Sequence, residues 1–130
     1  MLEDHVLAVP DEAAAIQAAG KGGELQIFAD VMYGAAATGL ERILGVPVTE
    51  LHQERDPLFG GGAPEPLPRH LSELMGQIKD REDKSLAVGF VFDGDADRIG
   101  SVDENGEFRS SQILIPVLIE HLSERRGMTG

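Results

Sequence analysis

The chain has 130 residues and a mass of 13.9 kDa, and its 23 acidic against 11 basic side chains give a formal net charge of −12. This charge argues against a nucleic-acid partner, which needs clustered Lys and Arg, and no apolar run approaches the roughly 20 residues of a membrane span. The absence of Cys excludes disulfides, thiolate metal ligands and thiol nucleophiles. We expect one globular domain over residues 1–130, and a cytoplasmic location because the start lacks a signal peptide.

The first 23 residues are mixed in composition and are predicted to lead into the domain. Within them, residues 10–19 favour a short helix, because Pro and acidic residues suit a helix N-terminus, and Gly20 is predicted to end it. Residues 25–29 are predicted to form the first strand. Residues 30–34 then form the turn from this strand into a helix.

That helix is predicted over 35–44, where apolar residues recur at helical spacing and Gly45 follows as a stop. A second strand is predicted over 46–51. Residues 52–66 contain three consecutive Gly and three Pro, which exclude regular structure. A loop of this length inside a compact domain is usually functional or disordered.

Further along, residues 68–81 carry apolar side chains at a spacing of three and four, which predicts a helix. Residues 86–92 are a near-continuous apolar run, typical of a strand buried on both faces of an α/β sheet. Residues 99–102 are predicted to be a further strand, and Asn105-Gly106 is a strong signal for a hairpin turn.

The last helix is predicted over 111–126, with Pro116 causing either a kink or a shifted start. Strands alternate with helices and a hairpin follows. This order predicts an α/β fold with three layers, α/β/α, around a mixed sheet of about four strands whose last strand is antiparallel.

The chemistry-bearing segment follows the apolar strand and places carboxylates at alternate positions, in Asp93, Asp95 and Asp97. The small Gly94 and Ala96 allow the chain to coil, so that all three carboxylates converge. Convergence of three negative charges is costly without a cation, and oxygen-only ligands favour a hard ion. We expect Mg²⁺, which keeps positions open for water or a substrate phosphate. Arg98 adds a positive group suited to phosphate oxygens.

Three alternatives remain open on spacing alone. The segment also fits a solvated acidic turn. It fits in part an EF-hand calcium loop, with Glu104 at position 12 but Arg98 where that loop requires Gly. It also fits a phosphatase in which Asp93 is the nucleophile and Asp95 the general acid and base, although that scheme leaves Asp97 and Arg98 without a role.

Three stretches resemble the α-D-phosphohexomutases, the phosphoglucomutase/phosphomannomutase family. Residues 90–108, FVFDGDADRIGSVDENGEF, are similar to the family's magnesium loop and hairpin. Residues 30–36, DVMYGAA, are similar to the turn after the first strand of its second domain, and residues 55–66, RDPLFGGGAPEP, to that domain's Gly/Pro loop. The resemblance covers about residues 24–126 and identifies the chain as an isolated second domain.

The resemblance implies an intramolecular phosphotransferase that interconverts hexose 1-phosphate and hexose 6-phosphate through a phosphoserine and a bisphosphate intermediate. Asp93, Asp95 and Asp97 would bind Mg²⁺, and Arg98 would stabilise charge on the moving phosphoryl group. The phosphoserine, the sugar-specificity loop and the phosphate site belong to the family's other three domains. We therefore expect this domain alone to be inactive and its partners to be those domains and a sugar phosphate.

Other polar residues carry weaker expectations. Asp30 is expected to accept backbone N–H groups of its turn rather than to bind a ligand, and Tyr33 to serve packing. The four histidines have no shared spacing and are expected to lie dispersed on the surface: His5, His52, His70 and His121.

Overall fold

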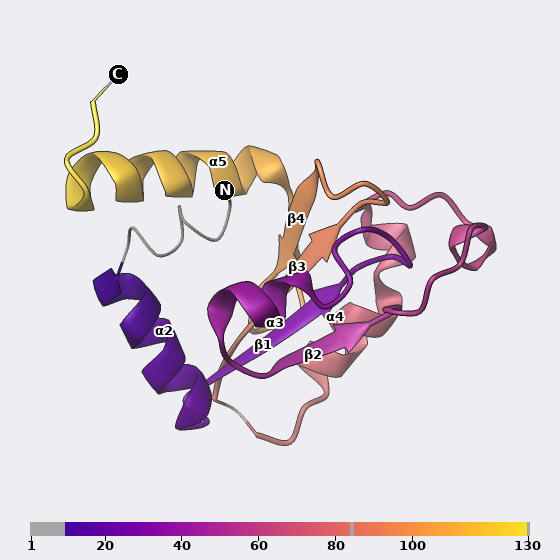
Figure 1. Cartoon of the computed structure of the whole chain (residues 1–130), viewed down its shortest axis with the longest axis horizontal. Helices are drawn as coiled ribbons and strands as arrows, with labels where there is room; N and C mark the ends of the chain where they lie inside the picture. Colours follow the sequence, from indigo (N-terminus) through magenta and orange to yellow (C-terminus); the bar gives the residue numbers. More distant parts are fainter. Residues whose placement is uncertain (1–9, 84, 130) are drawn as a thin grey trace.

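A computed structural model describes residues 10–83 and 85–129, which form a five-stranded mixed sheet with the strand order β2-β1-β3-β4-β5 (Figure 1). The strands are β1 Leu25–Asp30, β2 Val48–Leu51, β3 Leu86–Phe92, β4 Ile99–Val102 and β5 Phe108–Arg109. β1 pairs in parallel with β2 and β3, whereas β4 pairs antiparallel with both β3 and β5. The predicted α/β class is confirmed. The strand count was one short because the hairpin returns as a two-residue strand.

Helices cover both faces of the sheet, with α3 and α4 on opposite sides in Figure 1. The helices are α2 Pro10–Lys21, α3 Gly39–Leu44, α4 Ser72–Lys79 and α5 Ser111–Glu120. Phe28 of β1 belongs to the α4 side, while its strand neighbours Ile27 and Ala29 point to the opposite face and are also buried. Burial on both faces of β1 makes it the centre of the three layers.

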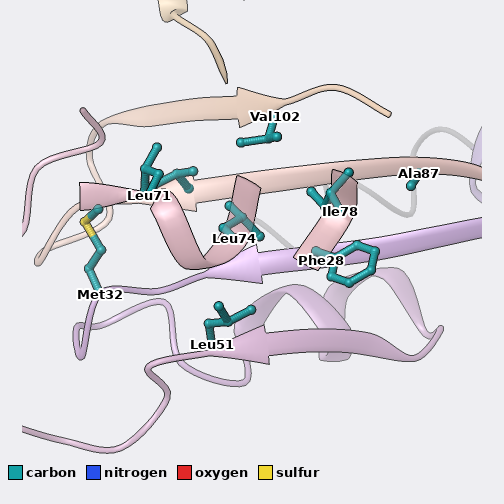
Figure 2. Packing of buried hydrophobic residues seen from close by; sticks show 9 residues of the cluster. Phe28, Met32, Leu51, Leu71, Leu74, Ile78, Ala87 and Val102 are labelled. Atoms are coloured by element: carbon teal, nitrogen blue, oxygen red, sulfur yellow. The ribbon is translucent and has the colours of Figure 1, made fainter. Parts of the chain in front are cut away.

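The main core lies between the sheet and α4 (Figure 2). Leu71, Leu74 and Ile78 are fully buried and pack against the α4 side of the strands. Gly89 of β3 allows the helix to come close, because a Cβ there would lie 2.7 Å from Cδ1 of Ile78 and 3.3 Å from Cβ of Val102. The spacing that predicted a helix over 68–81 therefore identified the right face. The helix itself is shorter, because Pro68–His70 is a 3₁₀ turn and α4 ends at Lys79.

The predicted helix over 35–44 is wrong in its first turn, because α3 begins only at Gly39. Thr38 has a φ of 62°, which lies in the left-handed region and interrupts a right-handed helix. The N–H of Ala35 also bonds outside any helix, to the carbonyl of Gly94 at 2.9 Å. Residues 32–38 are therefore a series of turns set by a distant loop.

Smaller differences between prediction and structure concern the ends of helices and the burial of β3. Gly20 does not end α2, which continues to Lys21, and the loop over 52–66 contains a 3₁₀ turn at Phe59–Gly61. In β3 only alternate residues are fully buried, against the expectation of burial on both faces. Leu86, at its start, is 57% exposed. Residues 1–9 of the predicted leading segment, His5 among them, lie outside the described residues.

The helix α5 begins at Ser111 and runs through Pro116, so the predicted shifted start is wrong. A π-helical turn, His121–Arg125, follows it. No residue of α5 is buried, although the helix is rich in Ile, Leu and Val. Ile115, Val117 and Ile119 are 54%, 56% and 61% exposed. Within the described part of the chain, α5 is therefore an apolar helix that the core does not cover.

The predicted turn at Asn105-Gly106 is confirmed, and Asp103 holds it together. Its Oδ1 accepts the N–H groups of Asn105 and Glu107 at 3.0 Å each, and its Oδ2 pairs with the Arg109 guanidinium at 2.9 Å. Burial raises the pKa of Asp103, but the hydrogen bonds from Glu107, Arg109 and Asn105 outweigh it and lower the pKa below its ordinary value. The charged form of Asp103 therefore stabilises the hairpin.

We predict that Asp103→Ala lowers the free energy of unfolding by about 1–3 kcal/mol at pH 7, because the turn loses charge-assisted hydrogen bonds. A depressed folded-state pKa gives stability that is present above the unfolded pKa, about 3.9, and is lost as pH falls below it. The difference between wild type and variant should therefore shrink between pH 5 and pH 3. Urea denaturation measures it, with Glu107→Ala as the control from the same turn. An equal difference at both pH values would contradict the assignment.

Candidate metal centre

The acidic loop joins the antiparallel strands β3 and β4 at the carboxyl end of β3. It folds back on itself, because the N–H of Ala96 donates to the carbonyl of Asp93 at 3.1 Å and Ala96 takes a φ of 63°. This left-handed residue reverses the chain between the second and third carboxylates. The coiling that the small residues predicted is therefore present.

The structure brings all three predicted metal ligands together. One carboxylate oxygen each from Asp93, Asp95 and Asp97 lies within 4.8 Å of the others. Across residues 10–83 and 85–129, no other group of His, Asp or Glu side chains meets this criterion. Asp93 is buried at 2% exposure, whereas Asp95 and Asp97 are exposed. The site thus has one buried anchor and two carboxylates open to solvent.

Asp93 organises the loop through both of its carboxylate oxygens. Oδ1 accepts the N–H groups of Asp97 and Arg98 at 3.0 and 3.1 Å, and Oδ2 accepts the Nε–H of Arg98 at 2.7 Å. Burial raises the pKa of Asp93, but these hydrogen bonds outweigh it and lower the pKa to about 2. Asp93 therefore carries its charge at every physiological pH.

The negative charges of the cluster act on Asp97. Its hydrogen bond with Asp93 and the nearby charges of Asp95 and Asp93 raise its pKa above the ordinary value. Three carboxylates and the paired Arg98 guanidinium leave a local charge of −2, which one divalent cation neutralises. The side chain of Arg98 is 58% exposed, so its guanidinium can also meet an anion.

The donor set fits a hard divalent cation. Every candidate atom is a carboxylate oxygen, and Mg²⁺ and Ca²⁺ are the ions that such sets prefer. The repulsion that raises the pKa of Asp97 is the cost that a bound cation would remove. Asp93, Asp95 and Asp97 are therefore the residues that would hold it.

Two of the alternatives fit the geometry poorly. An EF-hand loop lies between helices, whereas this loop lies between β3 and β4, and Glu104 lies in the next turn. A nucleophilic Asp93 would need a free oxygen open to substrate, whereas its carboxylate is buried and both oxygens accept hydrogen bonds. The geometry favours a ligand and loop anchor.

The turn after β1 supports the acidic loop from the neighbouring strand. Gly34 approaches so closely that a Cβ there would lie 2.4 Å from the carbonyl oxygen of Gly94. Phe59 of the Gly/Pro loop touches Gly94 from another side, with Cε1 3.1 Å from an added Cβ. The three stretches that resemble one family are therefore in contact with one another.

Asp30 behaves as expected, because its Oδ1 accepts the N–H of Met32 at 3.0 Å. Sequence reasoning missed its second partner, His52, whose Nδ1 lies 3.0 Å from the same oxygen. The Nε2 of His52 lies 3.1 Å from Oε2 of Glu73, and its ring packs on Tyr33 with centroids 4.8 Å apart. The expectation of a dispersed surface role for His52 is wrong. No local signal marks these partners, since His52 and Asp30 are 22 residues apart.

Comparisons with known proteins agree with the resemblance. The family profile described as "Phosphoglucomutase/phosphomannomutase, alpha/beta/alpha domain II" matches residues 4–106. Probable phosphoglucosamine mutases of Methanothermobacter thermautotrophicus and Methanopyrus kandleri are 35% identical over 81 residues and 30% identical over 129 residues. These alignments cover 62% and 97% of this chain but only 17% and 27% of the two relatives.

A solved structure of a phosphoglucomutase/phosphomannomutase family protein from Burkholderia thailandensis superposes with a TM-score of 0.66 at 29% identity. The match covers 78% of this chain and 22% of that one. None of the helices within residues 10–83 and 85–129 has both the length and the apolar character needed to cross a membrane.

We predict that Gly34→Ala destabilises the chain by about 1–3 kcal/mol, because the new Cβ meets a backbone carbonyl that cannot rotate away. It should also break the bond from Ala35 to Gly94 and displace the acidic loop. Urea denaturation and the amide exchange of Ala35 measure both effects. The matched control is Gly39→Ala, where no atom of the described residues lies within 4 Å of the added Cβ. Equal stability of the two variants would contradict the close approach.

Proposed function

This chain belongs to the phosphoglucomutase/phosphomannomutase family, and we propose that it supplies the Mg²⁺-binding domain of a phosphohexomutase. The observation that carries the proposal is the convergence of Asp93, Asp95 and Asp97 within 4.8 Å on a loop held by Arg98. The reaction would interconvert hexose 1-phosphate and hexose 6-phosphate by way of a phosphoserine and a bisphosphate.

The residues of the acidic loop would have different roles in this reaction. Asp93 holds the backbone of Asp97 and Arg98, so that the two exposed carboxylates stay beside it. A bound Mg²⁺ would supply charge neutralisation at the transferring phosphoryl group. Arg98, fixed at Nε by Asp93, would direct the rest of its guanidinium at phosphoryl oxygens, where charge spreads in the transition state.

The chain spans about a quarter or less of the curated relatives that it matches, so the whole reaction needs parts outside it. We propose that the sugar phosphate meets the acidic loop in a cleft shared with the family's other three domains. The exposed α5 supports this, because it lies beyond residue 106, where the domain II match ends, and presents apolar side chains for a neighbouring domain to cover. The fragment alone would be inactive.

We predict that Asp95→Asn weakens Mg²⁺ binding to the 130-residue chain at least tenfold, about 1.4 kcal/mol, because a charged oxygen ligand is lost. Isothermal titration calorimetry measures the affinity. Asp80→Asn, the same charge change on an exposed residue at the end of α4, is the matched control and should bind as wild type does.

In the full-length parent, Asp95→Asn should also lower mutase activity, whereas Asp80→Asn should not. Unchanged affinity and activity in Asp95→Asn would refute the assignment. Two further outcomes would instead support the phosphatase or the calcium-binding alternative. Release of phosphate from a sugar phosphate by the 130-residue chain alone would indicate a phosphatase, and a wide preference for Ca²⁺ over Mg²⁺ would indicate a calcium module.

A further inference from the structure

A second charged cluster lies beside the acidic loop, at the carboxyl ends of β1 and β2. His52 follows β2 and bridges two carboxylates, with Nδ1 3.0 Å from Oδ1 of Asp30 and Nε2 3.1 Å from Oε2 of Glu73 in α4. Asp30 is 1% exposed, and its Oδ2 has no hydrogen-bond partner among residues 10–83 and 85–129. A buried carboxylate of this kind needs a counter-charge, and His52 is the cation-forming group in contact with it.

The two contacts of His52 suit the charged form of its ring. An ionised carboxylate only accepts hydrogen bonds, so a His52 ring that bonds two ionised carboxylates donates from both nitrogens. A neutral imidazole donates from one nitrogen alone, whereas an imidazolium donates from both. Burial lowers the pKa of His52, but the hydrogen bonds and charges of Asp30 and Glu73 outweigh it and raise the pKa above its ordinary value. The charged ring thus joins β1, β2 and α4.

This bridge lies under a strained turn. Met32, Tyr33 and His52 have φ values of 47°, 58° and 54°, in the left-handed region that side chains rarely adopt. Such residues cost free energy and persist only where contacts hold them. Here the N–H of Tyr33 donates to the carbonyl of His52 at 2.8 Å, and the N–H of Met32 donates to Asp30. The strain is therefore held by the two residues of the ion pair.

Two paths lead from this turn to the acidic loop. Along the backbone, the N–H of Ala35 donates to the carbonyl of Gly94 at 2.9 Å. Through side chains, the Tyr33 ring packs on His52 and closely approaches Gly60, whose neighbour Phe59 touches Gly94. Gly94 separates the first two carboxylates of the cluster. A shift of the turn must therefore shift the carboxylates.

We propose that His52 is a positioning residue for the acidic loop: as an imidazolium bound to Asp30 and Glu73, it fixes the turn on which Gly94 rests. The inference rests on the proposed function in one respect, namely that the loop binds a divalent cation. Its consequence is a metal affinity that falls as pH rises through the titration of His52. Ordinary competition between protons and metal at carboxylates has the opposite sign.

Several other ionisable groups surround this ring. Tyr33 stacks on it from the turn, and His70 lines the same cavity of about 240 Å³ from the 3₁₀ turn before α4. Burial raises the pKa of Tyr33, and four carboxylates raise it further: Glu54, Asp30, Asp56 and Glu73. The surroundings of His52 are thus predominantly negative, which favours its charged form.

The test is an NMR titration of the 130-residue chain between pH 6 and pH 9, first without metal. We expect the amide resonances of Ala35 and Gly94 to move with the same midpoint as the imidazole of His52. We then expect Mg²⁺ affinity, measured by calorimetry, to fall about threefold or more across that midpoint, a coupling within the range known for packed networks.

Variants assign the effect to the bridge. His52→Gln should bind Mg²⁺ about threefold or more weakly at pH 6, with no dependence on pH up to 9. Glu73→Gln should shift the midpoint of His52, and the affinity profile with it, to lower pH. His70→Gln is the matched control, because it lines the same cavity but its Nδ1 contacts the carbonyl of Glu65, and it should keep the wild-type profile.

Amide resonances that do not follow His52, or an affinity that is flat or rises from pH 6 to pH 9, would overturn the proposal. If His52→Gln does not fold, the titration of the wild-type chain and the Glu73→Gln variant still test the proposal. If wild type binds no Mg²⁺ at any pH, the proposed function fails, while the metal-free amide titration still tests the positioning role.

Discussion

The structure of the candidate site depends on how one buried carboxylate is bound by its own loop. Asp93 accepts two backbone N–H groups at Oδ1 and the Arg98 side chain at Oδ2, and so closes the chain between β3 and β4 into a compact turn. Without these bonds, Asp93 would be an uncompensated charge in the interior. The carboxylates of Asp95 and Asp97 would then move apart because they repel each other. The same bonds thus stabilise the loop and bring the three candidate ligands together.

Asp30 repeats this arrangement on the adjacent parallel strand. Its β1 position pairs with Val91, so the two buried carboxylates lie at neighbouring strand ends, and each accepts an N–H from the turn that follows it. They differ in their counter-charges. Asp93 has a guanidinium, which stays charged at all relevant pH, whereas Asp30 has His52, whose charge depends on pH. The counter-charge of the loop after β3 is therefore independent of pH, whereas that of the turn after β1 depends on the protonation of His52.

The features that the sequence predicted depend on residues close together in the chain, whereas the features that it missed depend on residues far apart in the chain. The apolar run of β3, the turn at Asn105-Gly106 and the three converging carboxylates all depend on near neighbours, and local pattern revealed them. The start of α3 was missed because Ala35 bonds to Gly94, which is distant in sequence. His52 was missed for the same reason, since its two partners lie on different elements. Local spacing carries no information on such pairs.

The bond between the side chains of Arg98 and Asp93 also constrains the candidate site. Its Nε is committed to Asp93, so the orientation of the guanidinium is fixed by the carboxylate that anchors the cluster. A Lys at this position would lack the planar fork, which bonds Asp93 at Nε and thereby sets the direction of the remaining N–H groups. Asp95 and Asp97, being exposed, are the carboxylates that a cation from solvent meets first. A single buried residue, Asp93, therefore positions both the exposed carboxylates and the Arg98 guanidinium on one loop. Any displacement of Asp93 must disturb the carboxylates and the guanidinium together.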